Sequence, residues 1–514
     1  MRADYVDRFK GDWKRGLKRL VEQGAWFREA AFPYLTTVTC AGHATIATGS
    51  FPRSHGIIQN AWWDRELHQL MTCTQDPSVR NIGYDVPVTG GDSAVRLTTS
   101  TFADVMRTER GAHVVSLALK ARSAIMSAGH GGNAVTWLTE AGDSWVTSTA
   151  FADAPVNAVK TFTDANPLDA DFGKTWTRLL PASRYGGDDD GEGEAPPAGW
   201  TRTFPHELKG KADAPDAQYR ALWQRSPFAD AYLGRFASAL VESMRLGRHE
   251  MTDVLSISFS TPDLVGHAFG PQSHEVQDVY AHLDETIGVL LDRLDALVGK
   301  DDYLVALASD HGVIMLPEQM KQAGQDAGRL DSNAIRTVVE RHAADALGAG
   351  TYVARANGND VYFEPGTYAK ITATAGAIER VIDAVAALPG IAKVYRREQL
   401  REGAQSSDPR LRAAALGYFP GRNGDLVIVP KPGWSFAATG TTHGTAAADN
   451  QRVPILLMGY GIKPGQYMQP VTPADIAPTL AALCGVQLPK TEGQPLTAAL
   501  KAAPERPAGT RNPQ

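Results

Sequence analysis

Val254-Leu255-Ser256-Ile257-Ser258-Phe259 is an apolar run that predicts a buried strand, and Tyr303-Leu304-Val305-Ala306-Leu307-Ala308 predicts a second one. Between them, apolar residues recur at helical spacing from Val276 to Val298. Two buried strands separated by a long amphipathic helix are typical of a parallel sheet with crossover helices. We therefore predict an α/β fold: a doubly wound, mostly parallel sheet with helices on both faces.

Other segments extend this sheet. The spacing of apolar residues predicts an opening amphipathic helix from Val6 to Gly24, and Val114 to Leu119 reads as another buried strand. Trp137 and Trp145 to Thr149 suggest a hairpin. Leu426 to Val429 and Val453 to Met458 are both expected to return to the main sheet.

The expected organisation is one main domain with insertions. An acidic loop and a smaller α+β unit interrupt it, and a tail rich in Pro, Arg and Gly is expected to be disordered. The predicted parts are residues 1–324 (main domain, first part, with the solvated acidic loop 184–200), 325–430 (α+β insertion), 431–502 (return to the main domain) and 503–514 (tail).

Composition restricts the kind of partner. Lys and Arg total 51 against 57 Asp and Glu, which leaves a net charge of -6 without a basic block. The sequence therefore has no basic patch of the kind that binds nucleic acid. It also contains no run of about 18 apolar residues, the length needed to span a membrane. We expect a monomer with a small ligand. The acidic run from Asp188 to Glu194 lacks the spacing of a calcium loop.

The cysteine pattern is sparse. Cys40, Cys73 and Cys484 are an odd number of residues spread far apart. This pattern excludes a disulfide framework and any Cys-x-x-Cys metal site, and it leaves the redox compartment undecided.

Three short motifs follow predicted strands, where open α/β sheets place their ligands. Asp263 and His267 are four residues apart, so one helical turn can aim both at one ion. Asp310 and His311 are adjacent on a sharp turn, and Gly312 is expected to give the backbone the conformational freedom that lets both side chains reach one metal. His443 follows a Gly-rich loop. Each motif alone is weak, but together Asp and neutral imidazole suit zinc, and paired zinc ions suit phosphoryl displacement.

A fourth stretch, Thr36 to Gly56, is rich in threonine and small residues. Thr39 is expected at a helix N-terminus, which favours an anion. Taken alone, this stretch leaves two interpretations open: Thr39 is an activated nucleophile or a plain N-cap. Lys120 and Arg122, at the end of the strand from Val114, are two residues apart and would point together if strand geometry continues.

In their order and spacing these motifs resemble the alkaline phosphatase superfamily, over nearly the whole chain. They are most similar to the bacterial alkaline phosphatases that use a threonine nucleophile and are related to nucleotide pyrophosphatases/phosphodiesterases. The resemblance implies a phosphate monoester hydrolase with two Zn²⁺ per chain, a covalent phosphothreonine intermediate and a periplasmic or secreted location. By position it implies these roles: Thr39, nucleophile; Asp263, His267 and His443, ligands of one zinc; Asp310 and His311, ligands of the other; Lys120, Arg122 and Asn60, holders of the phosphate oxygens.

The resemblance also predicts a departure. In that family a first strand precedes the segment matching Met1 to Tyr5, and it ends in an aspartate that binds the same zinc as Asp310 and His311. We expect this aspartate and strand to be missing from the chain as given, through a truncated or mis-assigned start. The expected consequence is weak activity and a partly occupied second zinc site.

Other functions remain open. The main alternative is a phosphodiesterase or nucleotide pyrophosphatase on the same metal site, which would not need Lys120 and Arg122. A sulfatase is a poor match, because the residues that follow Cys40 do not complete the Cys-x-Pro-x-Arg pattern that formylglycine formation requires. A phosphate-binding scaffold would have no need of the nucleophile and five zinc-type ligands.

Overall fold

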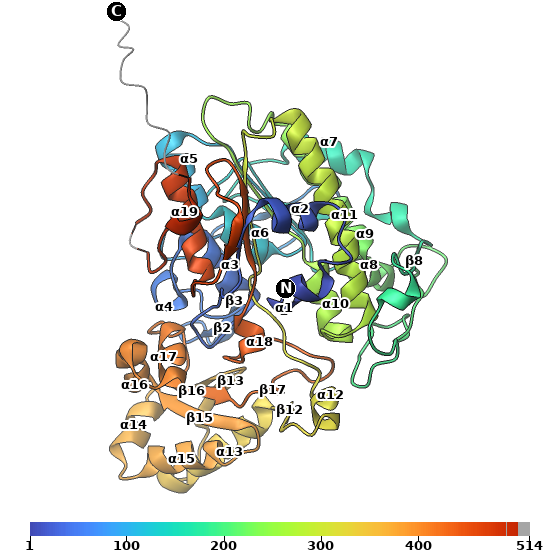
Figure 1. The fold of residues 1–514 in the computed structure, drawn as a ribbon. Helices are drawn as coiled ribbons and strands as arrows, with labels where there is room; N and C mark the ends of the chain where they lie inside the picture. Colours follow the sequence, from blue (N-terminus) through green and yellow to red (C-terminus); the bar gives the residue numbers. More distant parts are fainter. Residues whose placement is uncertain (490, 502–514) are drawn as a thin grey trace, which may run out of the picture.

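The computed structural model describes residues 1–489 and 491–501, and shows a large α/β body with a smaller lobe at one end (Figure 1). The tail predicted at 503–514 lies outside the described residues. Among these described residues, none of the helices has both the length and the hydropathy of a membrane-spanning segment.

The sheet of the main body is built in two parts. The first has the order β10-β5-β6-β7-β4, and β10, β5 and β6 pair in parallel. The second has the order β11-β18-β1-β19, in which β18 runs antiparallel to both neighbours. The strands are β1 (Ala25–Phe27), β4 (Asn81–Gly83), β5 (Val114–Ala118), β6 (Ala134–Leu138), β7 (Trp145–Ser148), β10 (Val254–Ser258), β11 (Leu304–Ala308), β18 (Ile455–Gly459) and β19 (Gly465–Tyr467).

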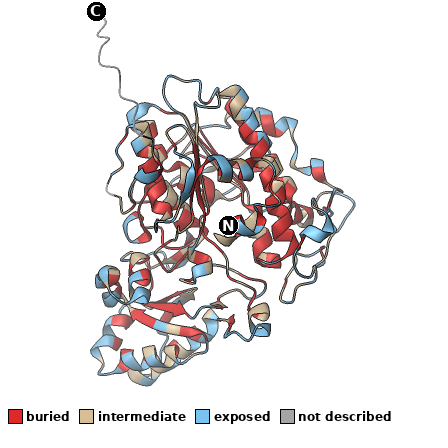
Figure 2. Ribbon diagram, in the orientation of Figure 1, coloured by how far each residue is buried: buried red, intermediate tan, exposed pale blue. Residues whose placement is uncertain are grey.

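Helices cover both faces of this sheet. Val115 and Leu117 of β5 pack in the core of one face, whereas Val114 and Ala118 pack in the core of the other. Successive side chains of a strand point to opposite faces, so an apolar run covered on both sides is what β5 requires. Many strand segments are accordingly coloured as buried in Figure 2, and β5 is buried along its whole length, whereas β10 and β11, which the sequence predicts to be buried, are only partly buried. The first face carries α1 (Asp4–Phe9), α2 (Gly16–Gln23), α7 (Asn157–Ala165), α8 (Ala217–Trp223), α9 (Pro227–Ser243), α10 (Thr261–Phe269) and α11 (His274–Leu297); the second carries α3 (Thr39–Thr48), α5 (Phe102–Arg110), α6 (Ala121–Ala128) and α19 (Ile476–Cys484).

The smaller lobe has its own antiparallel sheet and core. Its sheet order is β13-β14-β16-β15, with helices packed against both faces. Its elements are α13 (Ser332–Leu347), β13 (Val353–Asn357), β14 (Asp360–Phe363), α14 (Thr367–Ala373), α15 (Ala377–Ala386), β15 (Ile391–Arg396), α16 (Arg397–Glu402), α17 (Pro409–Leu416) and β16 (Leu426–Pro430). The prediction that Leu426 to Val429 returns to the main sheet is therefore wrong, because β16 pairs with β14 and β15.

Short elements connect these layers. They are α4 (Pro52–His55), β2 (Ala61–Asp64), β3 (Gln69–Thr72), β8 (Thr175–Trp176), β9 (His206–Glu207), α12 (Pro317–Gln322), β12 (Gly328–Arg329), β17 (Trp434–Ser435) and α18 (Ala448–Gln451).

The opening helix differs from the prediction. It is two helices, α1 and α2, with a break between residues 10 and 15. The carboxylate of Asp284 on α11 accepts backbone N–H groups of Lys14, Arg15 and Lys18, which satisfies donors at the start of α2. Sequence periodicity cannot reveal this break, because the capping carboxylate is distant in the sequence.

The acidic loop is not fully solvated as predicted. Glu194 is only 6% exposed, and no partner for its Oε2 is found among the described residues. Burial and the nearby charge of Glu275 raise the pKa of Glu194 from 4.5 to about 8. Burial also raises the pKa of Glu275 to about 8. The folded protein therefore holds protons that the unfolded chain releases above pH 4.5, and stability falls as pH rises from about 4.5 to about 8.

Replacing Glu194 by glutamine is expected to stabilise the protein at alkaline pH. Glutamine cannot ionise, so the cost of a buried charge disappears, and a gain of about 2 kcal/mol is expected at pH 9. The gain should shrink toward pH 5, where wild-type Glu194 is protonated. Denaturant unfolding at both pH values measures it, with exposed Glu192→Gln as the control. A gain that does not depend on pH would contradict this origin.

Candidate active site

Thr39 is the first residue of α3 and is buried, with 2% of its surface exposed. The N-cap of this helix is Val38, so the interpretation of Thr39 as a plain N-cap is wrong. Thr39 Oγ1 lies 3.4 Å from His311 Nε2. The hydroxyl therefore lies at the positive end of a helix and beside an imidazole from another part of the chain.

Two close contacts fix the start of α3. A Cβ on Gly42 would lie 2.0 Å from the carbonyl oxygen of Asp310, so only glycine lets α3 approach this loop. Cys40 is bonded to Cys73, and the Cys40 backbone N–H donates to Asn60 Oδ1 at 2.9 Å. Asn60 is thus fixed beside the residue that follows Thr39.

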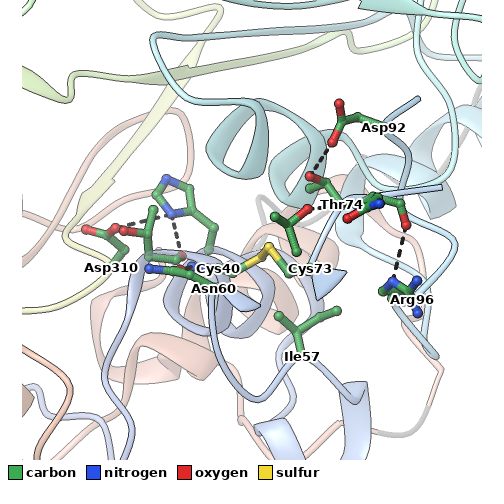
Figure 3. Close-up of a disulfide and its surroundings, with 12 residues drawn as sticks. Cys40, Ile57, Asn60, Cys73, Thr74, Asp92, Arg96 and Asp310 are labelled. Atoms are coloured by element: carbon green, nitrogen blue, oxygen red, sulfur yellow. Dashed lines mark hydrogen bonds and ion pairs between the residues drawn. A yellow bond between two sulfur atoms is a disulfide. The ribbon is translucent and has the colours of Figure 1, made fainter. Parts of the chain in front are cut away.

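The disulfide corrects the cysteine prediction, because two cysteines separated by 33 positions do pair. Figure 3 shows Asn60 and Asp310 on one side of it and Thr74, Asp92 and Arg96 on the other. The pairing joins α3 to the segment after β3. Spacing alone could not identify it, since only the fold brings the two sulfur atoms together.

Asp263, His267 and His443 form a cluster whose ligand atoms all lie within 4.8 Å of one another. Asp263 and His267 lie one turn apart on α10, with Asp263 Oδ1 3.4 Å from His267 Nε2. His443 arrives from the loop before α18, and its Nε2 lies 3.7 Å from the same oxygen. Three groups from two distant segments therefore converge on one point.

The imidazole rings are oriented for binding a metal through Nε2. His267 Nδ1 lies 2.8 Å from the Thr441 carbonyl oxygen, and His443 Nδ1 lies 2.9 Å from that of Thr37. A carbonyl oxygen can only accept, so each Nδ1 carries a proton and each Nε2 is the nitrogen left to bind a metal. Two such nitrogens and a carboxylate are the donors that zinc binds in catalytic sites, so these residues fit the ion.

Asp310 and His311 lie next to this cluster. His311 Nε2 is 3.3 Å from Asp310 Oδ2 and 3.9 Å from Asp263 Oδ1, and its Nδ1 donates to the Gly312 carbonyl oxygen at 2.9 Å. The nitrogen of Met1 lies 3.1 Å from the His311 carbonyl oxygen. The start of the described chain is therefore beside the loop that carries both predicted ligands.

Gly312 is needed for a different reason than the one predicted. A Cβ at this position would lie 1.9 Å from the Asp449 carbonyl oxygen, and Gly312 does not have a positive φ. It is therefore close packing that requires glycine after His311.

Lys120 and Arg122 do not continue a strand as predicted. Strand β5 ends at Ala118, Lys120 is the N-cap of α6, and Arg122 is inside that helix. Lys120 Nζ nevertheless lies 2.5 Å from Asp263 Oδ2. Arg122 is largely buried, and its Nε is without a partner among the described residues.

Electrostatic coupling links these groups. Burial lowers the pKa of Arg122, and the charges of Asp263 and Asp310 oppose that change. Burial alone would raise the pKa of Asp263, but Lys120 and the surrounding histidines hold it well below its usual value. Burial lowers the pKa of His443, which keeps that ring neutral at physiological pH. An ionised Asp263 thus lies beside a neutral His443 ring.

Sequence reasoning missed His43. Its Nδ1 lies 2.9 Å from the Thr39 carbonyl oxygen and 3.3 Å from Asp310 Oδ2, and its Nε2 lies 3.0 Å from Ser258 Oγ. His43 therefore positions Asp310 against α3. The available signal was its spacing, since it follows Thr39 by four residues and lies on the same face of a helix.

Comparisons with known proteins match this chain over most of its length. Residues 1–451 match the family described as type I phosphodiesterase / nucleotide pyrophosphatase. The chain is 30% identical over 508 residues to alkaline phosphatase PafA of Elizabethkingia meningoseptica, covering 97% of this chain and 92% of that protein. It is 31% identical to a Myroides odoratus protein named calcium-transporting ATPase (98% and 93% covered), and 30% identical to alkaline phosphatase PhoV of Synechococcus elongatus (98% and 91% covered).

A solved structure supports the fold. The crystal structure of wild-type PafA matches this chain with a TM-score of 0.88 and 29% identity, covering 98% of this chain and 97% of that one. The α/β fold class and the resemblance expected from the motifs are therefore confirmed.

Proposed function

Because the chain belongs to the type I phosphodiesterase / nucleotide pyrophosphatase family, we propose that it is a zinc-dependent phosphate monoester hydrolase, an alkaline phosphatase. The observation that carries the proposal is that Thr39 Oγ1 lies 3.4 Å from His311 Nε2, which in turn lies 3.9 Å from the Asp263 carboxylate that Lys120 also contacts. Small phosphorylated molecules are the proposed substrates.

Two metal positions are proposed. Asp263, His267 and His443 would hold one zinc, and Asp310 and His311 would contribute to the other. Bound zinc would supply Lewis-acid stabilisation of charge on the phosphate and on the Thr39 oxygen. Metal analysis of the purified chain tests this assignment, because a chain that binds no zinc would exclude it.

The residues of the chain supply the nucleophile and its orientation. Thr39 Oγ1 would attack phosphorus and form a phosphothreonine, which water then hydrolyses. The helix N-terminus at Thr39 and the buried setting favour the negative charge of the transferring group. His43 would hold Asp310 in place from the next turn of α3.

Lys120, Arg122 and Asn60 would select monoesters. A phosphate monoester is a dianion, and two cations with an amide donor stabilise a charge that a diester lacks. In the described part of the chain, Arg122 Nε has no hydrogen-bond partner. The negative charges of Asp263 and Asp310 favour the charged form of Arg122 and raise its pKa against the effect of burial. These features support the proposal that Arg122 binds a phosphate oxygen.

The second candidate function is a phosphodiesterase or nucleotide pyrophosphatase on the same site, which the family description favours. Arg122→Ala separates the two. For a monoesterase we expect kcat/KM for an aryl phosphate monoester to fall by about 100-fold, because a charge-assisted contact to the transition state is lost. The methyl diester of the same phenol should change by less than about threefold.

Arg96→Ala is the matched control, since Arg96 lies beyond the disulfide and contacts the Gln75 carbonyl oxygen. It should leave both substrates unaffected. Equal losses for monoester and diester in Arg122→Ala, or faster turnover of the diester by the wild-type chain, would favour the second candidate.

We propose a periplasmic or secreted location. The Cys40–Cys73 disulfide supports it, because such bonds persist in oxidising compartments.

A further inference from the structure

A second group of metal-type side chains lies at the opposite edge of the sheet. His113 directly precedes β5, Asp253 directly precedes β10, and His249 lies in the loop after α9. Their ligand atoms all lie within 4.8 Å of one another. Lys120 and Asp263 follow the other ends of the same two strands, so this group is separated from the candidate active site by the length of a strand, about 17 Å.

The three side chains face one another directly. His113 Nδ1 lies 3.0 Å from His249 Nδ1, and His249 Nδ1 lies 2.6 Å from Asp253 Oδ2. His113 Nδ1 lies 3.4 Å from Asp253 Oδ1. Donor atoms around a tetrahedral zinc are separated by about 3.3 Å, given metal–ligand distances near 2.0 Å. The observed separations therefore lie close to those of a metal chelate.

Hydrogen bonds alone explain this arrangement poorly. Two imidazole nitrogens that face each other at 3.0 Å cannot both carry a proton, and in neutral rings one must be the acceptor. The Asp253 carboxylate is already held by the backbone N–H groups of His113 and Gly247. Its orientation is thus fixed without the histidines, as expected for a ligand oriented by surrounding groups.

The local chain is shaped to bring His249 here. Arg245 has a φ of 55° and Gly247 a φ of 76°, so the loop after α9 turns back sharply before His249. Val254 N–H donates to the His113 carbonyl oxygen at 2.8 Å, which aligns the starts of β5 and β10. The His113 side chain is 39% exposed and that of His249 30%, so solvent could supply a fourth ligand.

We propose that His113, His249 and Asp253 form a divalent transition-metal site of the zinc class. Nitrogen and carboxylate donors select zinc, cobalt or nickel over calcium or magnesium. A bound ion would link the loop of residues 244–253 to the start of β5 through His249, Asp253 and His113. Its role is structural, because none of its ligands approaches Thr39 or the Asp263 cluster.

The test uses the full chain with the candidate active site disabled by His267→Ala and His443→Ala. After chelation and dialysis, Co²⁺ is titrated and its visible absorption recorded, and zinc per chain is counted by mass spectrometry. We expect a tetrahedral-type Co²⁺ spectrum that zinc displaces, and loss of one bound zinc when His113→Asn and His249→Asn are added. His130→Asn, at the same edge of the sheet but outside the group, should change neither.

Stability gives a second readout. Zinc should raise the melting temperature of the disabled chain, and the rise should vanish in His249→Asn alone, which retains the wild-type His113 and Asp253. Absence of a cobalt spectrum, or an equal zinc count with and without His113 and His249, would overturn the proposal. Because the chains that are compared share the same altered active site, either result is independent of the phosphatase proposal.

Discussion

Thr39→Ala is expected to reduce kcat for an aryl phosphate monoester by at least about 1,000-fold, which corresponds to roughly 4 kcal/mol of lost transition-state stabilisation. Alanine removes the hydroxyl that is proposed to carry the phosphoryl group, while α3 keeps its helical geometry. The Asp263 cluster is not altered, so the zinc content should remain that of the wild-type chain. Steady-state kinetics and metal analysis on the same preparation measure both effects.

Thr39→Ser is the matched control. Serine restores a hydroxyl at the start of α3, so it should recover much of the activity that alanine loses. Rapid acid quenching of the wild-type chain with substrate should leave phosphate on the peptide that contains Thr39, detected by mass spectrometry, and Thr39→Ala should leave none. Activity of Thr39→Ala within about tenfold of wild type would mean that water attacks directly, and would remove the covalent intermediate.

Asp263→Asn is expected to have the second large effect, because one carboxylate serves several partners. Asp263 Oδ1 faces His267, His443 and His311, and Oδ2 faces Lys120. Asparagine keeps the shape but removes the charge that offsets the cation and that is proposed to bind zinc. We expect zinc affinity to fall by at least about 100-fold and monoester turnover to fall in parallel.

Lys120→Met separates the two tasks of this contact. It removes the cation but leaves Asp263, so zinc should stay bound while monoester kcat/KM falls. Zinc counted in Asp263→Asn and in Lys120→Met, with calorimetric titration for affinity, distinguishes them. Wild-type zinc affinity in Asp263→Asn would show that Asp263 only neutralises Lys120, and would exclude it as a ligand.

Much of the fold was predictable because it depends on local patterns. The strands at Val254 and Leu304 and the helix between them follow from apolar runs and helical spacing, and the structure has them within a few residues. The break before Gly16 was not predictable, since the cap comes from Asp284 on a distant helix. The assignment of β16 failed for a similar reason: an apolar run reveals a strand but not its neighbour.

The candidate site divides in the same way. Asp263 with His267, and Asp310 with His311, are recognisable because each pair is close in the sequence. His43 and the Cys40–Cys73 bond escaped detection, because what gives them meaning is a neighbour from another segment. The strand geometry assumed for Lys120 and Arg122 was wrong, yet Lys120 still reaches Asp263 from the N-cap of α6.

By itself, the sequence determined the α/β class, the order of the motifs and the family resemblance, since these depend on residue type and spacing along one chain. Only the tertiary structure decided that β5 and β10 run side by side, which brings Lys120 to Asp263 at one end and His113 to Asp253 at the other. The physical reason is that a parallel sheet aligns strand ends from segments far apart in the sequence. Which side chains meet at those ends therefore depends on which strands pair, and no local sequence pattern encodes that pairing.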